Sequence, residues 1–211
     1  MSTGIGTGIE LWDLSAPSFL HAVPAFMEIY RAAMDPPADQ VQGRRAVMER
    51  HSTLPRFHAV AAIALGGTDP GGTAVGFAYG FHGHGGQWWH DVVTEELRRR
   101  DPTAVSAWFA DSFEIAEVHV HPRWQGIGVG RAVLERLAAA RTERTAALST
   151  RTGRTPAHRL YTSAGFVAVL PEFSFPGSPD QPFTIMAARL PLRRSDPVPP
   201  AGRSRAWPWT G

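Results

Sequence analysis

Three short apolar runs in the first part of the chain are typical of β-strands. They lie at residues 9–14, 57–65 and 74–81. The last two flank the glycine-rich stretch 66–72, so they are expected to pair as an antiparallel hairpin. Apolar residues from Phe19 to Tyr30 recur at helical spacing. A second helix is expected near residues 38–51, because Asp35-Pro36-Pro37 ends the first.

The second half of the chain continues this alternation of strand and helix patterns. Further strands are expected at residues 113–121, 146–149, 166–175 and 183–190. A helix with one apolar face starts at Val129. Thr155-Pro156 supplies the cap and first turn of another helix, which Gly165 ends.

The same patterns suggest how the chain is organised into parts. Residues 83–110 form an insert that contains glycine and tryptophan, and Asp101-Pro102 within it predicts a short helix through Trp108. Strands and helices together predict one mixed α/β domain over residues 8–192. Residues 193–211 are rich in proline and arginine and have no apolar period, so they are expected to be a disordered extension.

Composition removes several classes of chemistry. The chain of 211 residues has no cysteine, which excludes thiol catalysis, thiolate zinc sites and disulfides. It also has no lysine, so all 21 basic side chains are arginine. Residues 1–122 hold 8 arginines against 14 acids, whereas residues 123–159 hold 8 arginines against Glu135 and Glu143. A basic segment this short suits a small polyanion, such as a nucleotide phosphate, at least as well as a duplex.

Other features of the sequence bear on partners and location. No apolar run is long enough to cross a membrane and the N-terminus has no secretory pattern, so we expect a cytoplasmic protein without a membrane partner. Aromatic residues are not interleaved with arginines as a nucleic-acid platform requires, so no nucleic-acid partner is expected.

The segment with the most chemical information is Val118–Arg131. A strand leads into a turn with glycines at 126, 128 and 130, and a helix starts at once. Glycines admit a ligand close to the backbone, and the amides of a helix N-terminus favour an anion. The dinucleotide fingerprint does not fit, because the third glycine comes one residue early. The triphosphate-binding loop does not fit either, because it needs a lysine.

What remains is Gln125-x-x-Gly128-x-Gly130, preceded by Val120-His121-Pro122. Here the chain resembles the GNAT superfamily of acyl-CoA-dependent N-acetyltransferases. A second family element, Ala-x-x-Leu-Tyr-x-x-x-Gly-Phe, occurs at residues 157–166. The resemblance covers most of residues 8–192 and implies the GNAT fold, a mixed and mainly antiparallel central sheet flanked by helices.

The resemblance implies a binding site for acetyl-CoA as co-substrate. Backbone amides would bind its pyrophosphate at Gln125, Gly126, Ile127, Gly128, Val129, Gly130 and Arg131. The strand backbone at Val118, His119 and Val120 would pair with the pantetheine arm. Arginines of the basic segment would reach the 3′-phosphate, although Arg136, Arg141 and Arg144 can also form a solvated face. The reaction implied is direct attack of a primary amine in a ternary complex, with no metal.

The resemblance also implies catalytic roles. Tyr161 would act as general acid toward the departing thiolate, since a phenol is protonated at neutral pH; the alternative is a packed helix residue. The base would be Glu114 or Glu117, with His119 as a third candidate, and spacing does not choose between the two glutamates. Arg154 stands where many relatives have an asparagine that contacts the donor. Residues 151–155 are therefore left without an assigned role, since Arg154 could bind a phosphate or the contact could be missing.

Several alternatives remain after the resemblance. Two histidine groups, His82 and His84 with His90, and His119 with His121, have metal-ligand spacing but no supporting third ligand. The insert is longer than the hairpin that most relatives have at this point. Three positions are considered for its aromatic residues: lining an acceptor pocket, capping a dimer edge or packing in the core. The resemblance implies a small-molecule or peptide amine as acceptor, and the acidic residues 1–122 lead to the hypothesis that this amine is cationic. The sequence does not decide whether the protein forms a homodimer. The alternative function is that of a catalytically silent acyl-CoA-binding module.

Overall fold

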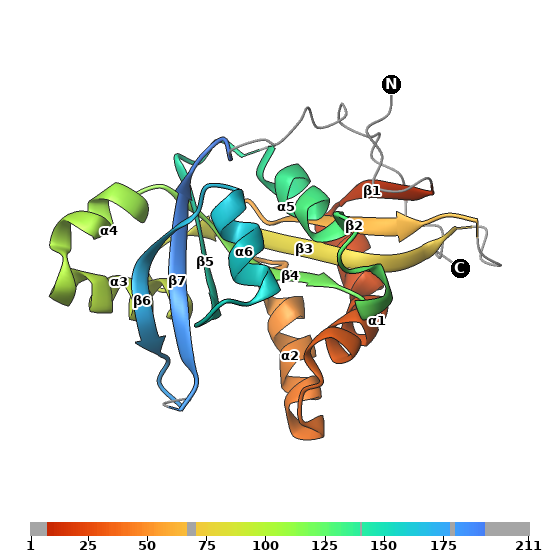
Figure 1. Ribbon diagram of the computed structural model, residues 1–211, viewed down its shortest axis with the longest axis horizontal. Helices are drawn as coiled ribbons and strands as arrows, with labels where there is room; N and C mark the ends of the chain where they lie inside the picture. The colour runs from red at the N-terminus through yellow and green to blue at the C-terminus, as the bar shows by residue number, and fades with distance from the viewer. Residues whose placement is uncertain (1–7, 67–70, 140, 178–179, 193–211) are drawn as a thin grey trace. The chain divides into compact units, whose positions relative to one another are not determined.

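The computed structural model describes residues 8–66, 71–139, 141–177 and 180–192 (Figure 1). In chain order the elements are β1 (Ile9–Leu14), α1 (Ala16–Met34), α2 (Ala38–His51), β2 (His58–Ala64), β3 (Thr73–Gly83), α3 (Trp88–Arg100), α4 (Pro102–Trp108), β4 (Ser112–Val120), the 3-10 turn η1 (Pro122–Trp124), α5 (Val129–Ala139), β5 (Thr145–Arg151), α6 (Pro156–Ser163), β6 (Val167–Ser174) and β7 (Pro182–Arg189). The predicted tail, residues 193–211, lies outside the described residues.

The strands form a seven-stranded sheet in the order β1-β2-β3-β4-β5-β7-β6. β2 pairs with both β1 and β3 in antiparallel fashion, and β7 does the same with β5 and β6. β4 and β5 are parallel, with Ser112 opposite Thr145 and Glu114 opposite Ala147 at the end of the ladder. The mixed, mainly antiparallel α/β fold predicted from the sequence is confirmed.

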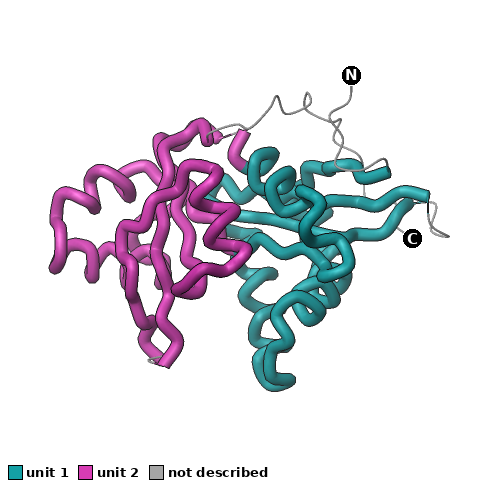
Figure 2. The backbone as a smooth tube through the Cα atoms, viewed as in Figure 1, with its two compact units in different colours: residues 1–81, 117–137, 196–211 teal, residues 82–116, 138–195 magenta. Residues whose placement is uncertain are grey.

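The chain divides into two compact units, which Figure 2 distinguishes by colour. Within the described ranges, the first unit comprises residues 8–66, 71–81 and 117–137, and the second comprises residues 82–116, 138–139, 141–177 and 180–192. Strand β4 contributes its first five residues to the second unit and its last four to the first.

The core of the first unit is aromatic. Helix α1 buries a stripe of apolar residues at helical spacing, as predicted. Phe26 stacks on Phe77 of β3 with ring centroids 4.4 Å apart, and Phe19 meets Tyr79 edge-on at 5.0 Å. Helix α5 adds a fully buried face, which consists of Val129, Val133, Leu134 and Leu137. Helices α1 and α5 of this unit are therefore held in place through their apolar faces.

An ion pair also joins α5 to β1 in the first unit. Arg136 is 8% exposed, and its Nε lies 3.2 and 3.1 Å from the two carboxylate oxygens of Asp13. Burial acts to raise the Asp13 pKa, but hydrogen bonds from His58 and Arg136 outweigh it and lower the pKa to about 2. The solvated position considered for Arg136 is therefore wrong, because this arginine is buried and joins α5 to β1 through its bonds to Asp13.

The second unit contains the helix that the sequence patterns did not predict. Helix α3 fills most of the insert, and α4 follows it with Asp101 as its N-cap, as expected. Val93, Leu97 and Phe109 pack on residues of β5, β6 and β7. Trp89 and Trp108 pack against this cluster, whereas the Trp88 side chain is 59% exposed. Core packing is thus confirmed for two tryptophans of the insert.

None of the helices in the described ranges combines the length and the apolar character that crossing a lipid bilayer requires.

Candidate active site

The turn between β4 and α5 has two backbone positions that favour glycine. Gly126 and Gly128 have φ values of +79° and +94°, where an L side chain is strained. Space is not the limit, because a Cβ atom at either position would meet nothing within 4 Å. Both residues are exposed, so a ligand can approach the backbone closely.

Helix α5 begins directly after this turn. Its backbone hydrogen bonding starts with the amide of Ala132, which donates to the carbonyl of Gly128 at 3.0 Å. The amides of Val129 and Gly130 belong to the first turn, where N–H groups have no acceptor within the helix. Together with the helix dipole, such groups attract an anion. The predicted strand–turn–helix geometry is present, and phosphate binding there stays a prediction.

Side-chain contacts hold the turn against its strands. Gln125 Nε2 donates to the carbonyl of Val120 at 2.9 Å, which occupies one of the strand carbonyls expected near the pantetheine arm. A Cβ atom at Gly76 on β3 would lie 3.1 Å from Val129 Cγ1 and 3.2 Å from the carbonyl of His119. The missing side chain at Gly76 therefore lets the start of α5 pack closely on the strands.

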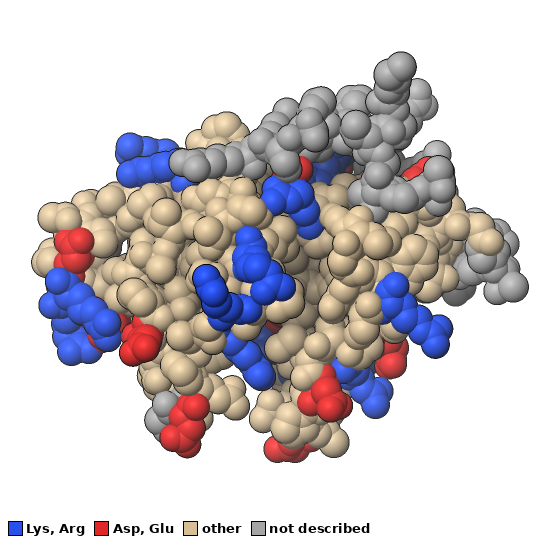
Figure 3. Space-filling model, in the orientation of Figure 1, with Lys and Arg blue, Asp and Glu red and all other residues tan. Residues whose placement is uncertain are grey.

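The arginines of the basic segment are not all open to a phosphate. Arg131 Nη1 lies 3.0 Å from Glu135 Oε1, and the guanidinium of Arg141 lies over the ring of Phe113, 4.9 Å from its centroid. Arg136 is paired as described above. Figure 3 shows basic side chains in several separate groups, with acidic side chains among them. The excess of positive charge in residues 123–159 therefore overstates the cations available to a ligand.

Glu117 lies in a buried polar cluster of the first unit. Its Oε1 accepts from Arg44 Nη1 at 2.8 Å, and its Oε2 is bonded to Nε2 of His119. The Glu117 side chain is 8% exposed. Arg44 comes from α2 and also lies over the ring of Tyr30, 5.4 Å from its centroid. Both oxygens of the Glu117 carboxylate are therefore occupied.

These partners keep Glu117 ionised. Burial acts to raise the Glu117 pKa, but the charge and hydrogen bond of His119, followed by the charge of Arg44, hold it below its ordinary value. Nearby, burial lowers the pKa of His51 to about 4, and His51 Nδ1 lies 3.2 Å from the hydroxyl of Tyr79. A carboxylate with a lowered pKa and both oxygens hydrogen-bonded is a weak proton acceptor.

Glu114 has a different environment in the second unit. Its Oε1 lies 2.6 Å from His90 Nδ1 on α3. Its Oε2 is buried and has no hydrogen-bond partner among the described residues. Gly83 makes room for the carboxyl group, because a Cβ atom there would lie 2.2 Å from Glu114 Oε1.

The Glu114 pKa is shifted in the opposite direction to that of Glu117. Burial raises it above the ordinary value, and the hydrogen bond and charge of His90 counteract only part of that rise. Weaker contributions from His84 and His82 act in the same sense as His90. A buried carboxylate with a raised pKa and one unpartnered oxygen is suited to accepting a proton.

Tyr161 lies on α6 in the second unit and is 7% exposed. Its ring packs against Phe166, with centroids 5.8 Å apart. Helix α6 starts as predicted, because the Thr155 hydroxyl accepts from the amide of His158 at 3.0 Å. Arg154 precedes this cap and is exposed. Both the general-acid role of Tyr161 and a donor contact of Arg154 stay predictions.

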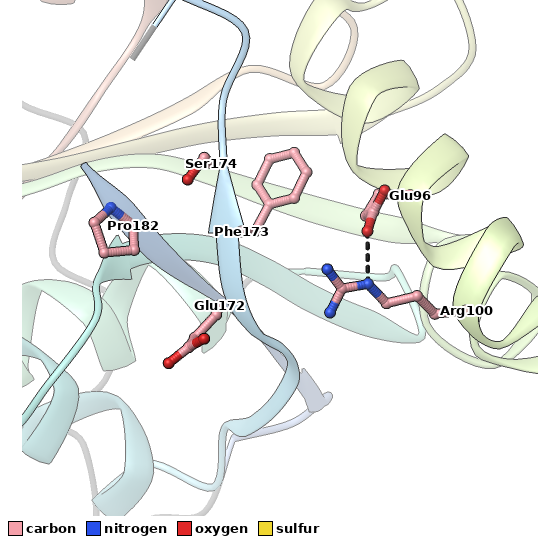
Figure 4. A pocket seen from close by; sticks show the side chains of 6 residues that line it. All are labelled: Glu96, Arg100, Glu172, Phe173, Ser174 and Pro182. Carbon is pink, nitrogen blue, oxygen red and sulfur yellow. Dashed lines mark hydrogen bonds and ion pairs between the residues drawn. The ribbon is translucent and has the colours of Figure 1, made fainter. Parts of the chain in front are cut away.

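The second unit also contains a pocket of about 360 Å³, shown in Figure 4. Glu96 and Arg100 of α3 line one side and are joined by a 2.6 Å hydrogen bond. The other lining residues are Glu172, Phe173, Ser174 and Pro182. None of the site residues predicted from the sequence lines this pocket. Within the described ranges, no three histidine or acidic side chains are arranged to hold a metal ion.

Two residues of these clusters were not predicted as partners of the glutamates. His90 was considered only as a metal ligand, although His90, Val93 and Leu97 follow the spacing of a buried helix face. That spacing, applied to residues 88–100, would have predicted α3. Arg44 lies 73 residues before Glu117, and no local pattern connects them.

Comparison with known proteins identifies the family. Residues 60–168 match the sequence profile of the acetyltransferase (GNAT) domain, which is more than half of the chain. The chain therefore belongs to the GNAT acetyltransferases and is an acyltransferase enzyme. The resemblance read from Gln125-x-x-Gly128-x-Gly130 is confirmed.

A curated relative agrees with this assignment, and two solved structures share the fold. The chain is 37% identical over 123 residues to the GCN5-like protein acetyltransferase Rv2170 of Mycobacterium tuberculosis, over 56% of this chain and 59% of that protein. The ribosomal-protein-S18-alanine N-acetyltransferase of Escherichia coli superposes with a TM-score of 0.58 and 18% identity, covering 89% of this chain and 97% of that one. PaiA N-acetyltransferase of Thermoplasma acidophilum, solved with coenzyme A, superposes with a TM-score of 0.54 and 13% identity, covering 87% and 99%.

The opposite environments of the two glutamates predict opposite pH dependences of stability. Because the Glu117 pKa is lowered in the folded protein, its carboxylate stabilises the fold at neutral pH, and this contribution disappears as the pH falls. Glu117→Gln should therefore lower the free energy of unfolding by about 2 kcal/mol at pH 7. Urea denaturation of both proteins should show that loss shrinking toward acidic pH.

Glu114→Gln is the matched control for that experiment. Because the Glu114 pKa is raised, ionising its carboxyl group costs stability at neutral pH, and protonation removes this cost as the pH falls. Glu114→Gln should therefore be at least as stable as the wild-type protein at pH 7. Its advantage should decrease toward acidic pH. The same pH trend in both variants would contradict the assigned environments.

Proposed function

We propose that the protein is an N-acetyltransferase that moves the acetyl group of acetyl-CoA to a primary amine by direct attack in a ternary complex. The observation that carries this proposal is the exposed turn at residues 125–131, in which Gly126 and Gly128 have positive φ and lead into the first turn of α5. In a chain of the GNAT family, that turn is the natural site for the pyrophosphate of the donor.

The remaining steps use side chains of the second unit. Glu114 accepts the proton that the acceptor amine loses, because it has the raised pKa and the unpartnered oxygen. The neutral amine nitrogen loses this proton as it attacks the thioester carbon, the C–S bond breaks, and the CoA thiolate takes a proton from the Tyr161 hydroxyl. Protonated Glu114 then releases its proton to solvent, and the Tyr161 phenolate takes one up, which restores both groups. Glu117, with both oxygens bonded, stabilises the first unit and takes no part in proton transfer.

The acceptor is a primary amine of a protein, peptide or small molecule. Rv2170 is named a protein acetyltransferase, and the chain is 37% identical to it over 123 residues. The chain covers only 59% of the length of that relative. That this chain also acetylates a protein is therefore part of the proposal. Protein and peptide amines are therefore the first acceptors to assay, followed by polyamines and other small amines.

A thiol-release assay over such an amine panel tests the proposal directly. The chain has no cysteine, so a thiol reagent reports released CoA without background from the protein. Tyr161→Phe should reduce kcat by about 100-fold with little change in the Kd for acetyl-CoA, because the general acid acts only in the chemical step. An unchanged kcat would remove the role of Tyr161.

Tyr30→Phe is the matched control, since Tyr30 is buried to a similar extent, at 6% exposed against 7% for Tyr161. Its kcat should stay within a few-fold of wild type. If acetyl-CoA binds but no amine in the panel releases CoA, a catalytically silent acyl-CoA-binding module replaces the proposed enzyme.

The donor site predicts a separate effect at Gly128. Gly128→Val places a β-branched side chain at φ +94°, which should reshape the turn and weaken acetyl-CoA binding by about 10-fold. Isothermal titration calorimetry measures that affinity. Gly43→Ala on α2 is the control, because a Cβ atom there meets nothing within 4 Å and no positive φ is required. Equal affinities in the two variants would place the donor elsewhere.

A further inference from the structure

We propose that His90 relays the proton of the acceptor amine to Glu114, so that the base of the enzyme is an imidazole–carboxylate pair. This inference rests on the proposed function. It assigns a role in proton transfer to a residue of α3, the helix that fills the insert at residues 88–100. The pair lies within the second unit.

The exposure of the two side chains determines the order of the relay. The side chain of Glu114 is 4% exposed and its Oε2 is buried, whereas the side chain of His90 is 11% exposed. A proton from a bound amine therefore reaches the more exposed imidazole before it reaches the carboxylate. An imidazole can pass it on, because it accepts at one ring nitrogen while it donates from the other.

The contact between His90 and Glu114 has the geometry of an oriented imidazole base. Nδ1 of His90 lies 2.6 Å from Glu114 Oε1, which assigns the ring proton to Nδ1 when the carboxyl group is ionised. Nε2 is then unprotonated and is the accepting atom. In the transfer, Nε2 gains the proton of the amine and Nδ1 gives its own proton to Glu114 Oε1. The imidazole ends neutral and the carboxyl group ends protonated.

Neighbouring residues hold the pair in place. The ring of Phe109 meets the imidazole of His90 edge-on at 6.0 Å. Thr94 Oγ1 donates to the carbonyl of His90 at 2.7 Å, one turn along α3. Gly83 leaves the space that the Glu114 carboxyl group occupies. Strand β3, helix α3 and strand β4 therefore each contribute to one arrangement of two titratable side chains.

Other titratable groups near the pair do not share its geometry. His84 and His82 contribute to the electrostatics of Glu114, but no hydrogen bond joins them to it in the described residues. His84 is exposed, and its Nδ1 lies 2.7 Å from the carbonyl of Gly85. His82 Nδ1 lies 3.4 Å from Glu143 Oε1. Within the part of the chain that the structure describes, only His90 is bonded to the Glu114 carboxyl group.

Kinetics of two His90 variants separate a relay from a merely structural role. Asn can place a donor near the position of Nδ1 but has no basic nitrogen, so His90→Asn should keep the contact with Glu114 and still lose about 100-fold in kcat. The KM for acetyl-CoA should not change. His90→Ala should be equally slow, and added imidazole should restore part of its kcat. His84→Asn is the matched control and should keep the wild-type kcat within about twofold.

The kinetic outcomes distinguish failure of the relay from failure of the proposed function. A wild-type kcat in His90→Asn would overturn the relay and leave the acetyltransferase in place. A slow His90→Ala that imidazole does not restore would also overturn it and reduce His90 to a structural residue. If the wild-type protein turns over no amine, the proposed function fails. Nitrogen-15 NMR then tests, without turnover, whether His90 and Glu114 have the protonation that the relay requires.

Nitrogen-15 NMR of histidine-labelled protein reads the pair without any turnover. The His90 signals are those that His90→Asn removes. At neutral pH they should report a proton on Nδ1 and an unprotonated Nε2, and Glu114→Gln should change that preference. A proton on Nε2 in the wild-type protein would overturn the relay, because the accepting nitrogen would already be occupied.

Discussion

Burying an ionised carboxylate is costly unless charges and hydrogen bonds replace the lost water, and β4 buries two glutamate side chains. Glu114 and Glu117 are three residues apart on this strand, and they belong to different compact units. Each therefore needs its own set of partners. Helix α2 supplies Arg44 for one and helix α3 supplies His90 for the other. Much of the polar structure around β4 follows from this requirement.

The environments of Glu114 and Glu117 differ in how well they stabilise the ionised carboxylate, and this difference bears on which of the two is suited to accept a proton. A fully satisfied carboxylate, such as Glu117 with Arg44 and His119, is stable as an anion and has little tendency to take a proton. Glu114 has one neutralising partner and one unpartnered oxygen, so its anionic form is poorly stabilised. The poor stabilisation of this anion is what supports the proposed role of Glu114 as proton acceptor. Spacing along the strand carries no information on that difference.

The sequence predicted the elements whose signals are local. Helices α4 and α6, which Asp101 and Thr155 cap, the hairpin of β2 and β3 and the turn into α5 all follow from residues next to one another, and the structure contains them. Helix α3 was missed because glycine and tryptophan at the start of the insert masked its apolar spacing. The partners of the glutamates were missed for another reason, since they lie 24 and 73 residues away in the chain. Only tertiary structure brings them together.

The donor turn and the proton-accepting pair rest on different kinds of constraint. The turn depends on backbone conformation, through the positive φ of Gly126 and Gly128 and the close approach that Gly76 permits. Most side chains of residues 125–131 can therefore vary without altering the amides that face a phosphate. The pair depends instead on two side chains and on the placement of α3. If the proposed roles hold, a change in the insert would alter proton transfer while the donor turn stays intact, which is one way in which a single fold can serve many amines.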